Sequence, residues 1–557
     1  MTDLSKTTRP AFRPPGPGGW RGEFERLAAQ PPRPIAGPPP RRRRIVVPLL
    51  VGASDLFLAR EGLIGHALRL RGADVLFALC DGLPACDART HDNDPAEMCR
   101  GCAAHGADAL RAFGHRFVRL SELVDRDEAR AARERAAACP PEALFAARLG
   151  GAALGDFVFA STLRYFRAGA FEADDPAVVA KAREYLAAAT IWALAARALY
   201  RRLAPSKVFS SHGIYSSWGP WHAVARAMNV PYASYSGGWR RGTLLCRSDE
   251  PRAFDCDDIW PRWADRPLNA ARRRRIEEYL GSREDNRADF YQYFDRLDRD
   301  AAAFAARLDV SFDGWRRRVG VFTNVAYDAA RPRAAGAFPN MFEWLTGAVA
   351  RAARDPRTLV IVKTHPAERR FIERTPGRWS AAAALRRALD PLPPNVRIVD
   401  PDDNVSTRTL YGLIDLGLVY TSSVGLEMAA AGLPVLTPGT GVHYEKPGIV
   451  LTAADPASYF AALDALLEDP ASFRPDHELL LRYAYTLYFR KSIPFEPLDV
   501  AGWEAAGLAI DDLAELAPGR FPGLDALCEG ILNDAPFEAP DADETPGGGA
   551  TKRGGRR

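Results

Sequence analysis

The chain has 557 residues, 47% of them hydrophobic and 26% charged, which is enough for two domains with cores of their own. The net charge of +4 is unevenly spread, because residues 1–44 carry ten Lys/Arg and three acids, whereas residues 536–557 carry four of each. The body of the chain is therefore mildly acidic, which argues against a nucleic-acid-binding protein. No stretch has the roughly 18 consecutive apolar residues of a membrane span, so we expect a cytoplasmic protein, with peripheral association at the inner face of a membrane left open.

Alternating strand-like and helix-like patterns predict an α/β protein with two doubly wound, Rossmann-like domains facing a cleft. Both ends are rich in Pro, Gly or Arg and are expected to be disordered. We place a disordered tail at 1–43, a first Rossmann-like domain that binds the acceptor at 44–249, a helical spacer at 250–318, a second Rossmann-like domain that binds a nucleotide-sugar at 319–474, C-terminal helices packing back on the first domain at 475–535, and a second disordered tail at 536–557.

The first domain opens with a β-α-β pattern: a strand at 45–51, a helix at 56–71 and a strand at 73–79. The loop after the first strand ends in Asp55, which we take as the candidate catalytic base. This loop lacks the G-x-G-x-x-G pattern of dinucleotide-binding turns, so we expect neither NAD nor FAD.

Four cysteines follow the second strand with the spacing Cys80-x5-Cys86-x12-Cys99-x2-Cys102, and His91 and His105 lie nearby. One C-x-x-C pair with two further thiols suits a structural zinc ion that braces a long loop. The alternative is a set of reduced, partly buried thiols, because the spacing is not that of a usual zinc finger.

Two later strands of the first domain, at 207–211 and 231–235, run into loops that combine small, aromatic and basic residues. The first loop contains His212 and Gly213, and the second contains Trp239 and Arg240. These loops suit the wall of a sugar-binding cleft, and simple turn chemistry is the alternative.

The second domain carries the strongest pattern. A buried strand at 359–362 ends in Lys363-Thr364-His365-Pro366, and an apolar run at 413–419 leads to Thr421-Ser422-Ser423-Val424-Gly425-Leu426-Glu427. Because the carboxyl ends of parallel strands meet at one edge of a sheet, both motifs are expected to share a crevice. Backbone N–H groups and hydroxyls there suit a phosphate, and Glu427 suits ribose hydroxyls. A capped helix and a packed histidine are the alternatives.

These motifs resemble those of the bacterial capsule-polysaccharide biosynthesis glycosyltransferases, a group with two Rossmann domains (GT-B). The resemblance rests on Asn324-Val325-Ala326-Tyr327-Asp328, Phe342-Glu343-Trp344, His365-Pro366-Ala367-Glu368, the Ser422 motif, Gly432-Leu433-Pro434-Val435 and His443-Tyr444-x3-Gly448. It covers residues 320–450 well, and the first half mainly through His212-Gly213.

The His-Pro motif followed by Ser-Ser is also similar to cytidine-nucleotide transferases for Kdo and sialic acid, in which the histidine and hydroxyls hold the phosphate of a CMP leaving group. The resemblance implies that His365 is catalytic and that no cofactor or divalent metal is required. The implied nucleotide-binding residues are Lys363, Pro366, Thr421, Ser422, Ser423, Gly425 and Glu427. The implied acceptor or sugar contacts are His212, Gly213, Trp239, Arg240, Asn324, Asp328 and His443. The acidic motif that supplies the base in sialyltransferases has no counterpart in the first half of this chain. Conversely, the cysteine-rich loop of this chain has no counterpart in those enzymes.

We therefore expect a glycosyltransferase of surface polysaccharide biosynthesis, which transfers a sugar from a nucleotide-sugar, preferably a CMP-sugar, to a glycan or glycolipid acceptor. A UDP-sugar 2-epimerase-like enzyme is one alternative, because it shares two Rossmann domains, a His-Pro motif and a Ser-rich helix start. A non-catalytic polysaccharide-binding or assembly component is the other.

Overall fold

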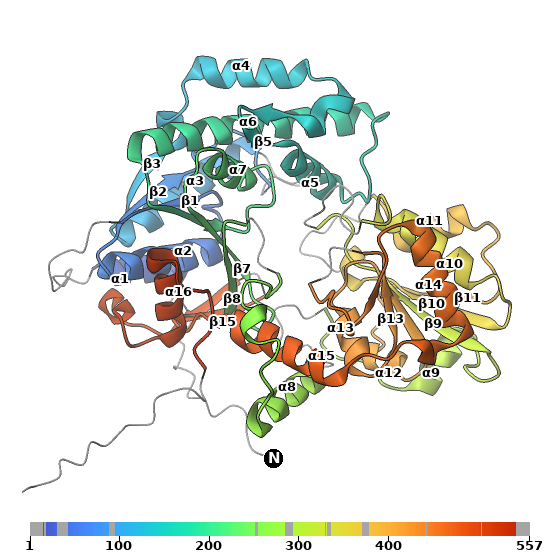
Figure 1. The fold of residues 1–557 in the computed structure, drawn as a ribbon. Coiled ribbons are helices and arrows are strands. Elements are labelled where there is room, and N and C mark those ends of the chain that lie inside the picture. The colour runs from blue at the N-terminus through green and yellow to red at the C-terminus, as the bar shows by residue number, and fades with distance from the viewer. Residues whose placement is uncertain are drawn as a thin grey trace, which may run out of the picture.

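A computed structural model describes residues 15, 18–29, 43–87, 95–250, 254–283, 293–328, 330, 336–369, 378–439, 443–502 and 504–541. Most of the N-terminal tail, His91 and residues 542–557 fall outside these ranges. The chain forms two lobes, each built on one main sheet (Figure 1). Within the described residues, no helix has both the length and the apolar character needed to cross a bilayer.

The first lobe contains a seven-stranded sheet in the order β15-β8-β7-β6-β1-β2-β3. Its strands are β1 (Arg44–Leu49), β2 (Asp74–Leu79), β3 (Arg116–Arg119), β6 (Lys207–Ser211), β7 (Tyr232–Gly237), β8 (Thr243–Ser248) and β15 (Ile493–Pro494). The strands from β7 to β3 are parallel, whereas β8 and β15 add antiparallel pairs at one edge. Counted along the chain, the five parallel strands lie in the doubly wound order 3-2-1-4-5.

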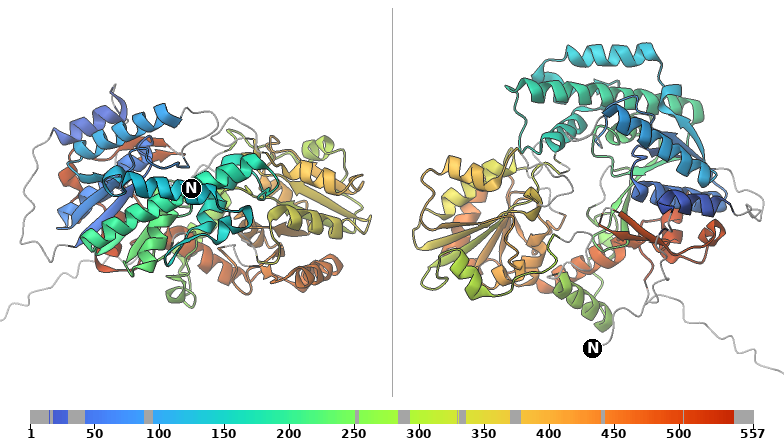
Figure 2. Two further views of the ribbon diagram at one scale, coloured as in Figure 1. Left: turned by 90° about the horizontal axis from the view of Figure 1, so that it is seen from above. Right: turned by 180° about the vertical axis from the view of Figure 1, so that it is seen from behind.

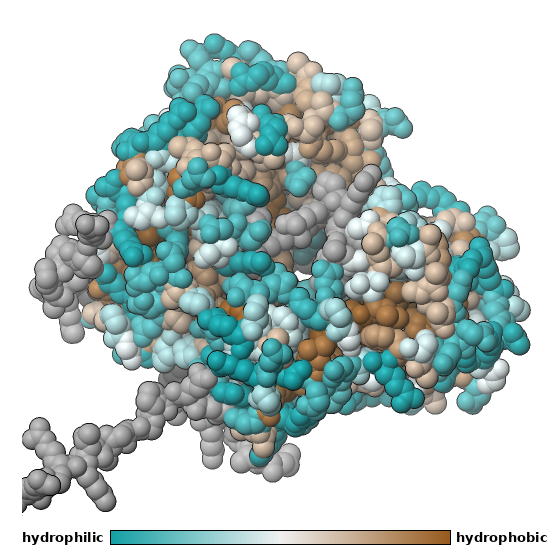
Figure 3. Space-filling model, in the orientation of Figure 1, coloured by the Kyte–Doolittle hydropathy of each residue, from teal (hydrophilic) through white to brown (hydrophobic). Residues whose placement is uncertain are grey.

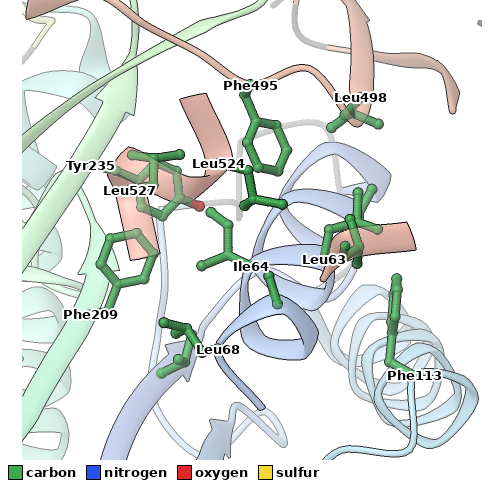
Figure 4. Close-up of a cluster of buried hydrophobic side chains, with 14 of the residues drawn as sticks. Leu63, Ile64, Leu68, Phe113, Phe209, Tyr235, Phe495, Leu498, Leu524 and Leu527 are labelled. Carbon is green, nitrogen blue, oxygen red and sulfur yellow. The ribbon is translucent and has the colours of Figure 1, made fainter. Parts of the chain in front are cut away.

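Helices cover both faces of this sheet. One face carries α1 (Gly19–Ala28), α2 (Asp55–Leu70), α3 (Pro95–Ala112) and α16 (Pro522–Asn533), and the other carries α4 (Arg126–Ala137), α5 (Gly155–Phe166), α6 (Pro176–Leu203) and α7 (Gly219–Ala227). Each face has its own buried cluster, and Figure 4 shows part of the first, where Ile64 of α2 lies beside Tyr235 of β7. Burial on both faces explains why β1 reads as a nearly continuous apolar run.

The second lobe contains six parallel strands in the order β11-β10-β9-β12-β13-β14, which is the Rossmann order 3-2-1-4-5-6. The strands are β9 (Arg317–Phe322), β10 (Thr358–Lys363), β11 (Val396–Val399), β12 (Leu416–Val419), β13 (Val435–Thr437) and β14 (Leu451–Thr452). The helices are α10 (Met341–Ala352), α11 (Ala381–Ala388), α12 (Thr407–Tyr411), α13 (Val424–Ala430) and α14 (Pro456–Glu468). The two sheets confirm the predicted fold class.

The chain crosses between the lobes twice. Going out, it forms α8 (Ala270–Ser282) and α9 (Ala301–Arg307); returning, it forms α15 (His477–Tyr485) and a π-helical turn (Thr486–Lys491) (Figure 2). The expectation that residues 475–535 form helices alone is wrong for part of this segment. β15 joins the edge of the first sheet, and β16 (Leu498–Ala501) pairs with β17 (Glu504–Leu508). Strands this short carry too few residues to show a period of two.

Both tails contain ordered structure that the composition concealed. Helix α1 lies inside the expected tail 1–43, and it buries Trp20, Phe24 and Leu27 in the first-lobe core. At the other end, Phe537 is buried and the Asp541 carboxylate pairs with Arg272 at 2.6 Å. The expectation of disorder is therefore wrong for residues 19–28 and 536–541, where a few well-spaced apolar or acidic side chains find partners despite the surrounding Pro and Gly.

Candidate functional site

A cavity of about 660 Å³ lies between the lobes. It is lined by the segments that follow β1, β6 and β7 in the first lobe and β9, β10 and β12 in the second. The strand order reverses between β1 and β6 in the first sheet and between β9 and β12 in the second, and ligands of doubly wound proteins bind in such crevices. In the space-filling view, the molecule is hollowed where the two lobes face each other (Figure 3).

His365 lines this cavity directly after β10. Its Nδ1 accepts a hydrogen bond from the Ala367 backbone N–H at 3.1 Å, and its own backbone N–H donates to Thr323 Oγ1 at 3.0 Å. Burial, assisted by the charge of Lys363, lowers the pKa of His365 to about 4. The imidazole is therefore neutral near pH 7, with its proton on Nε2, and it is a hydrogen-bond donor rather than a charged acid.

Lys363, the last residue of β10, supplies a positive charge to the same wall. Its Nζ donates to the Asp403 carbonyl at 3.1 Å. Burial lowers the pKa of Lys363 to about 8, although nearby acids such as Asp403 and Asp400 oppose the change. The ammonium group is thus mostly charged at neutral pH and lies close to losing its proton.

The serine motif approaches the cavity from β12. Ser422 and Ser423 line it, whereas Thr421 and Gly425, two predicted nucleotide contacts, do not. Gly425 has a packing role instead, since a Cβ there would collide with the Tyr444 ring, whose hydroxyl donates to the Ser422 carbonyl. The helix that follows, α13, has only seven residues. The hydroxyls are therefore the main donors that this motif offers.

Glu427, expected to bind ribose, lines the cavity but already has protein partners. Arg283 Nη2 lies 3.0 Å from Oε1, and the Tyr411 hydroxyl donates to Oε2 at 3.2 Å. A ribose hydroxyl would have to use the remaining lone pairs of these two oxygens.

The first lobe contributes His212, which follows β6, and Trp239, which follows β7. Gly213 does not line the cavity but has φ +64°, a left-handed conformation that glycine adopts without strain. Arg240, predicted to contact the sugar, points elsewhere, because its Nε donates to the Tyr488 carbonyl at 2.6 Å. Its basic side chain thus holds the returning C-terminal segment.

Three further predicted sugar contacts lie at or behind the junction of the lobes. Asp328 lines the cavity and accepts a hydrogen bond from Tyr215 across the lobes at 2.8 Å. Asn324 does not line it and bonds the Val325 carbonyl. His443 lies behind Trp239, with ring centroids 4.5 Å apart, and burial lowers the pKa of His443 to about 3.

The structure corrects the assignment of Asp55 as catalytic base. Asp55 does not line the cavity, and its Oδ1 lies 2.7 Å from His105 Nε2. Asp87 does line the cavity, and sequence reasoning missed it because it stands in the cysteine-rich loop without a motif of its own. Its Oδ2 accepts from Ser217 at 2.8 Å, Oδ1 is buried without a partner, and burial raises the pKa of Asp87.

The four cysteines gather at the base of the Asp87 loop. Burial raises the pKa of the Cys80 thiol well above its usual range, and the thiols of Cys86, Cys102 and Cys99 raise it further. All four are free, and no His, Cys, Asp or Glu group of three or more in the described ranges is arranged to hold a metal ion. Zinc binding stays a prediction, and metal analysis of protein purified without chelators tests it.

The fold and the site define a two-domain α/β protein with a largely apolar cleft that carries several cationic and hydroxyl groups. The structure is similar to the β-Kdo 2,4 transferase KpsC of Thermosulfurimonas dismutans (14% identity, 56% of this chain and 88% of that chain, TM-score 0.33). It is also similar to sucrose-phosphate synthase from Thermosynechococcus elongatus (13%, 80% and 95%, TM-score 0.28) and to UDP-GlcNAc 2-epimerase from Neisseria meningitidis (10%, 79% and 95%, TM-score 0.23). No protein-family model matches the sequence, and no curated protein does.

Proposed function

We propose that the protein is a glycosyltransferase that moves a sugar from a nucleotide-sugar to a glycan or glycolipid acceptor in the cleft. One observation supports the proposal. The cavity is lined in one lobe by Lys363, His365 and Ser422, two of which were predicted to hold a leaving phosphate, and in the other lobe by the carboxylate of Asp87. A leaving-group wall opposite a basic group is the arrangement that glycosyl transfer requires.

In the proposed reaction, an acceptor hydroxyl oxygen attacks the anomeric carbon while the bond from that carbon to the phosphate oxygen breaks. The electron pair of the broken bond goes to the phosphate, where the Lys363 charge, the His365 Nε2–H and the serine hydroxyls stabilise the developing negative charge. This stabilisation comes from groups of the chain itself. The acceptor sugar would lie against Trp239 and His212.

We assign the role of general base to Asp87, which would accept the proton of the acceptor hydroxyl. It is the one carboxylate of the first lobe that lines the cavity within the described ranges, and its Oδ1 has no partner. A raised pKa makes a carboxylate a better proton acceptor once it is ionised, which suits a general base. The serine hydroxyl of Ser217 holds the other oxygen.

Nucleotide binding gives the first test. A ligand that binds only the folded protein stabilises it by about 2.7 kcal/mol at 100 times its Kd, so melting temperatures in the presence of CMP, CDP, UDP and GDP rank the nucleotides. We expect the cytidine nucleotides to give the largest shifts, on the basis of the His-Pro and Ser-Ser pairing. A shift with UDP or GDP and none with CMP or CDP would contradict the cytidine preference, and no shift with any nucleotide would favour a non-catalytic component.

A matched pair of variants tests the wall itself. Ser422→Ala combined with Ser423→Ala should weaken nucleotide binding about tenfold or more, because two hydroxyl donors to phosphate are lost. Thr421→Val, one residue outside the cavity, should leave binding within about threefold. Analysis of products from the preferred nucleotide-sugar, with and without glycan acceptors, then separates transfer from epimerisation, which needs no acceptor.

A further inference from the structure

A second charged wall of the cavity has no role in the proposed leaving-group chemistry. It lies in the first lobe, at the amino-terminal end of α2, where Ser54, Phe57 and Arg60 line the cavity. Arg60 is 4% exposed, and its Nε is buried without a hydrogen-bond partner. A buried guanidinium normally has a carboxylate beside it, because removing a charge from water is costly.

The Arg60 guanidinium interacts with the Tyr235 hydroxyl and, through space, with the neighbouring Glu61, but its Nε–H has no acceptor among the described residues. Its neighbour Glu61 is turned to the Tyr235 hydroxyl, which donates to Oε1 at 2.7 Å. Burial raises the pKa of Glu61, although the hydrogen bond from Tyr235 and the charge of Arg60 oppose the change. The aromatic ring of Tyr235, 5.7 Å from the Arg60 guanidinium carbon, covers one side of the cation.

Two further features mark this wall as a binding site for an anion. Helix α2 has sixteen residues, and its N-cap residue, Ser54, makes no side-chain hydrogen bond to the first turn, so backbone N–H groups there remain for a ligand. The only acid of that turn, Asp55, is held by His105. On β7, Ser236 is 6% exposed, lines the same cavity and has a buried hydroxyl without a partner.

We propose that Arg60, Ser236 and the amino-terminal end of α2 form a second anion subsite, which binds a phosphate or carboxylate group of the acceptor. It is separate from the Lys363 wall, because it is built on the other sheet. That the bound anion belongs to the acceptor rests on the proposed function. The subsite itself rests on two buried donors without partners, Arg60 Nε and the Ser236 hydroxyl.

Binding of simple anions tests the subsite. Inorganic phosphate and, in a parallel series, acetate are titrated into the full-length protein by calorimetry, once in Lys363→Met and once in wild type saturated with its preferred nucleotide. In Lys363→Met the cation of the second lobe is missing, and in the saturated wild type the nucleotide occupies that wall. Both titrations therefore report on the first-lobe subsite. The stronger of the two anions identifies the group that the subsite accepts.

We expect Arg60→Met to raise the anion Kd at least tenfold while nucleotide affinity stays within threefold. Arg164→Met is the matched control, since Arg164 also lines the cavity but lies beside a carboxylate, 3.8 Å from Asp328, and it should change the anion Kd less than threefold. Because Met fills the space of an unpaired buried cation, the melting temperature of Arg60→Met should stay level or rise.

Anion binding that survives Arg60→Met, or that Arg164→Met removes equally, overturns the proposal. So does a fall in the melting temperature of Arg60→Met by more than a few degrees, which would give Arg60 a structural role. If no nucleotide binds but anion binding still depends on Arg60, the subsite stands and the glycosyltransferase proposal fails.

Discussion

The geometry of His365 allows its two ring nitrogens to be tested separately. Nδ1 accepts the Ala367 N–H at 3.1 Å and thereby caps the short turn that follows β10, whereas Nε2 is left to donate into the cavity. An asparagine at this position can reproduce the first interaction, because its Oδ1 stands near the place of Nδ1. A glutamine can reproduce the second, because its amide reaches the place of Nε2.

The two variants should therefore lose opposite properties. His365→Asn removes one preorganised donor to the leaving phosphate, which should cost about 10²–10³ in turnover, or about 2.7–4 kcal/mol, with a melting temperature near that of wild type. His365→Gln leaves the Ala367 N–H unpaired, which should lower stability by about 1 kcal/mol, or about 2–4 °C, while turnover stays at least tenfold above that of His365→Asn.

Turnover, nucleotide affinity and melting temperature are measured on the same preparations, with His365→Ala as the reference that loses both interactions. Nucleotide affinity should fall less than turnover in each variant, because the donor matters most when charge develops on the phosphate. Equal turnover in His365→Gln and His365→Ala would refute a neutral donor and favour a charged general acid, which an amide cannot replace. Turnover of His365→Ala within about threefold of wild type would remove His365 from catalysis altogether.

Three further outcomes follow from the same structure. Asp87→Asn should lower turnover by two to four orders of magnitude, whereas Asp55→Asn should change it less than threefold, and the reverse result would restore Asp55 as the base. Nucleotide affinity should decline as pH rises through about 8, because Lys363 loses the proton that attracts phosphate; a decline that persists in Lys363→Met would assign it to another group. Phe24→Ala should lower the free energy of unfolding by about 3 kcal/mol, because Phe24 is 2% exposed and packs on Phe113 with ring centroids 5.2 Å apart; an unchanged chemical-denaturation midpoint would mean that α1 adds nothing to stability.

The helices and strands that could be predicted from the sequence are those with a regular hydrophobic pattern. Strands buried on both faces often appear as apolar runs, and the run of β10 was expected within one residue of its observed bounds. β6, in which Val208 and Phe209 stand between Lys207 and two serines, was expected at its observed bounds. Helix α6 also carries its own sequence signals, because Pro176 stands at its start and an Ala-rich run follows. The missed elements are short or isolated, such as α1 and the strand pair β16 and β17. Their stability depends on partners far along the chain, for example the Trp20 Nε1 hydrogen bond to the Ala505 carbonyl.

The site divides in the same way. His365 and Ser422 could be predicted to meet because both follow parallel strands, and strand order decides which loops are neighbours. Asp87 and Arg60 could not, since Asp87 stands eight residues after the end of β2 and Arg60 lies on the second turn of α2. Arg240 was misassigned for a related reason: a loop after a strand has two sides, and its composition does not say which side faces the cavity.

The charges of the cavity connect the two proposals. Each lobe presents a buried cation to the cavity, Lys363 at the end of β10 in one lobe and Arg60 on α2 in the other, and in both cases burial lowers the pKa of the group. Such cations cost free energy in the empty protein, and the cost is recovered only when an anion enters. A donor with a phosphate on one wall and an acidic acceptor on the other would neutralise both cations. Because the two anions share one cavity, each lowers the positive potential that attracts the other, so their binding should be mildly anticooperative. The acceptor-side anion should therefore lower nucleotide affinity slightly in wild type, and this coupling should disappear in Arg60→Met.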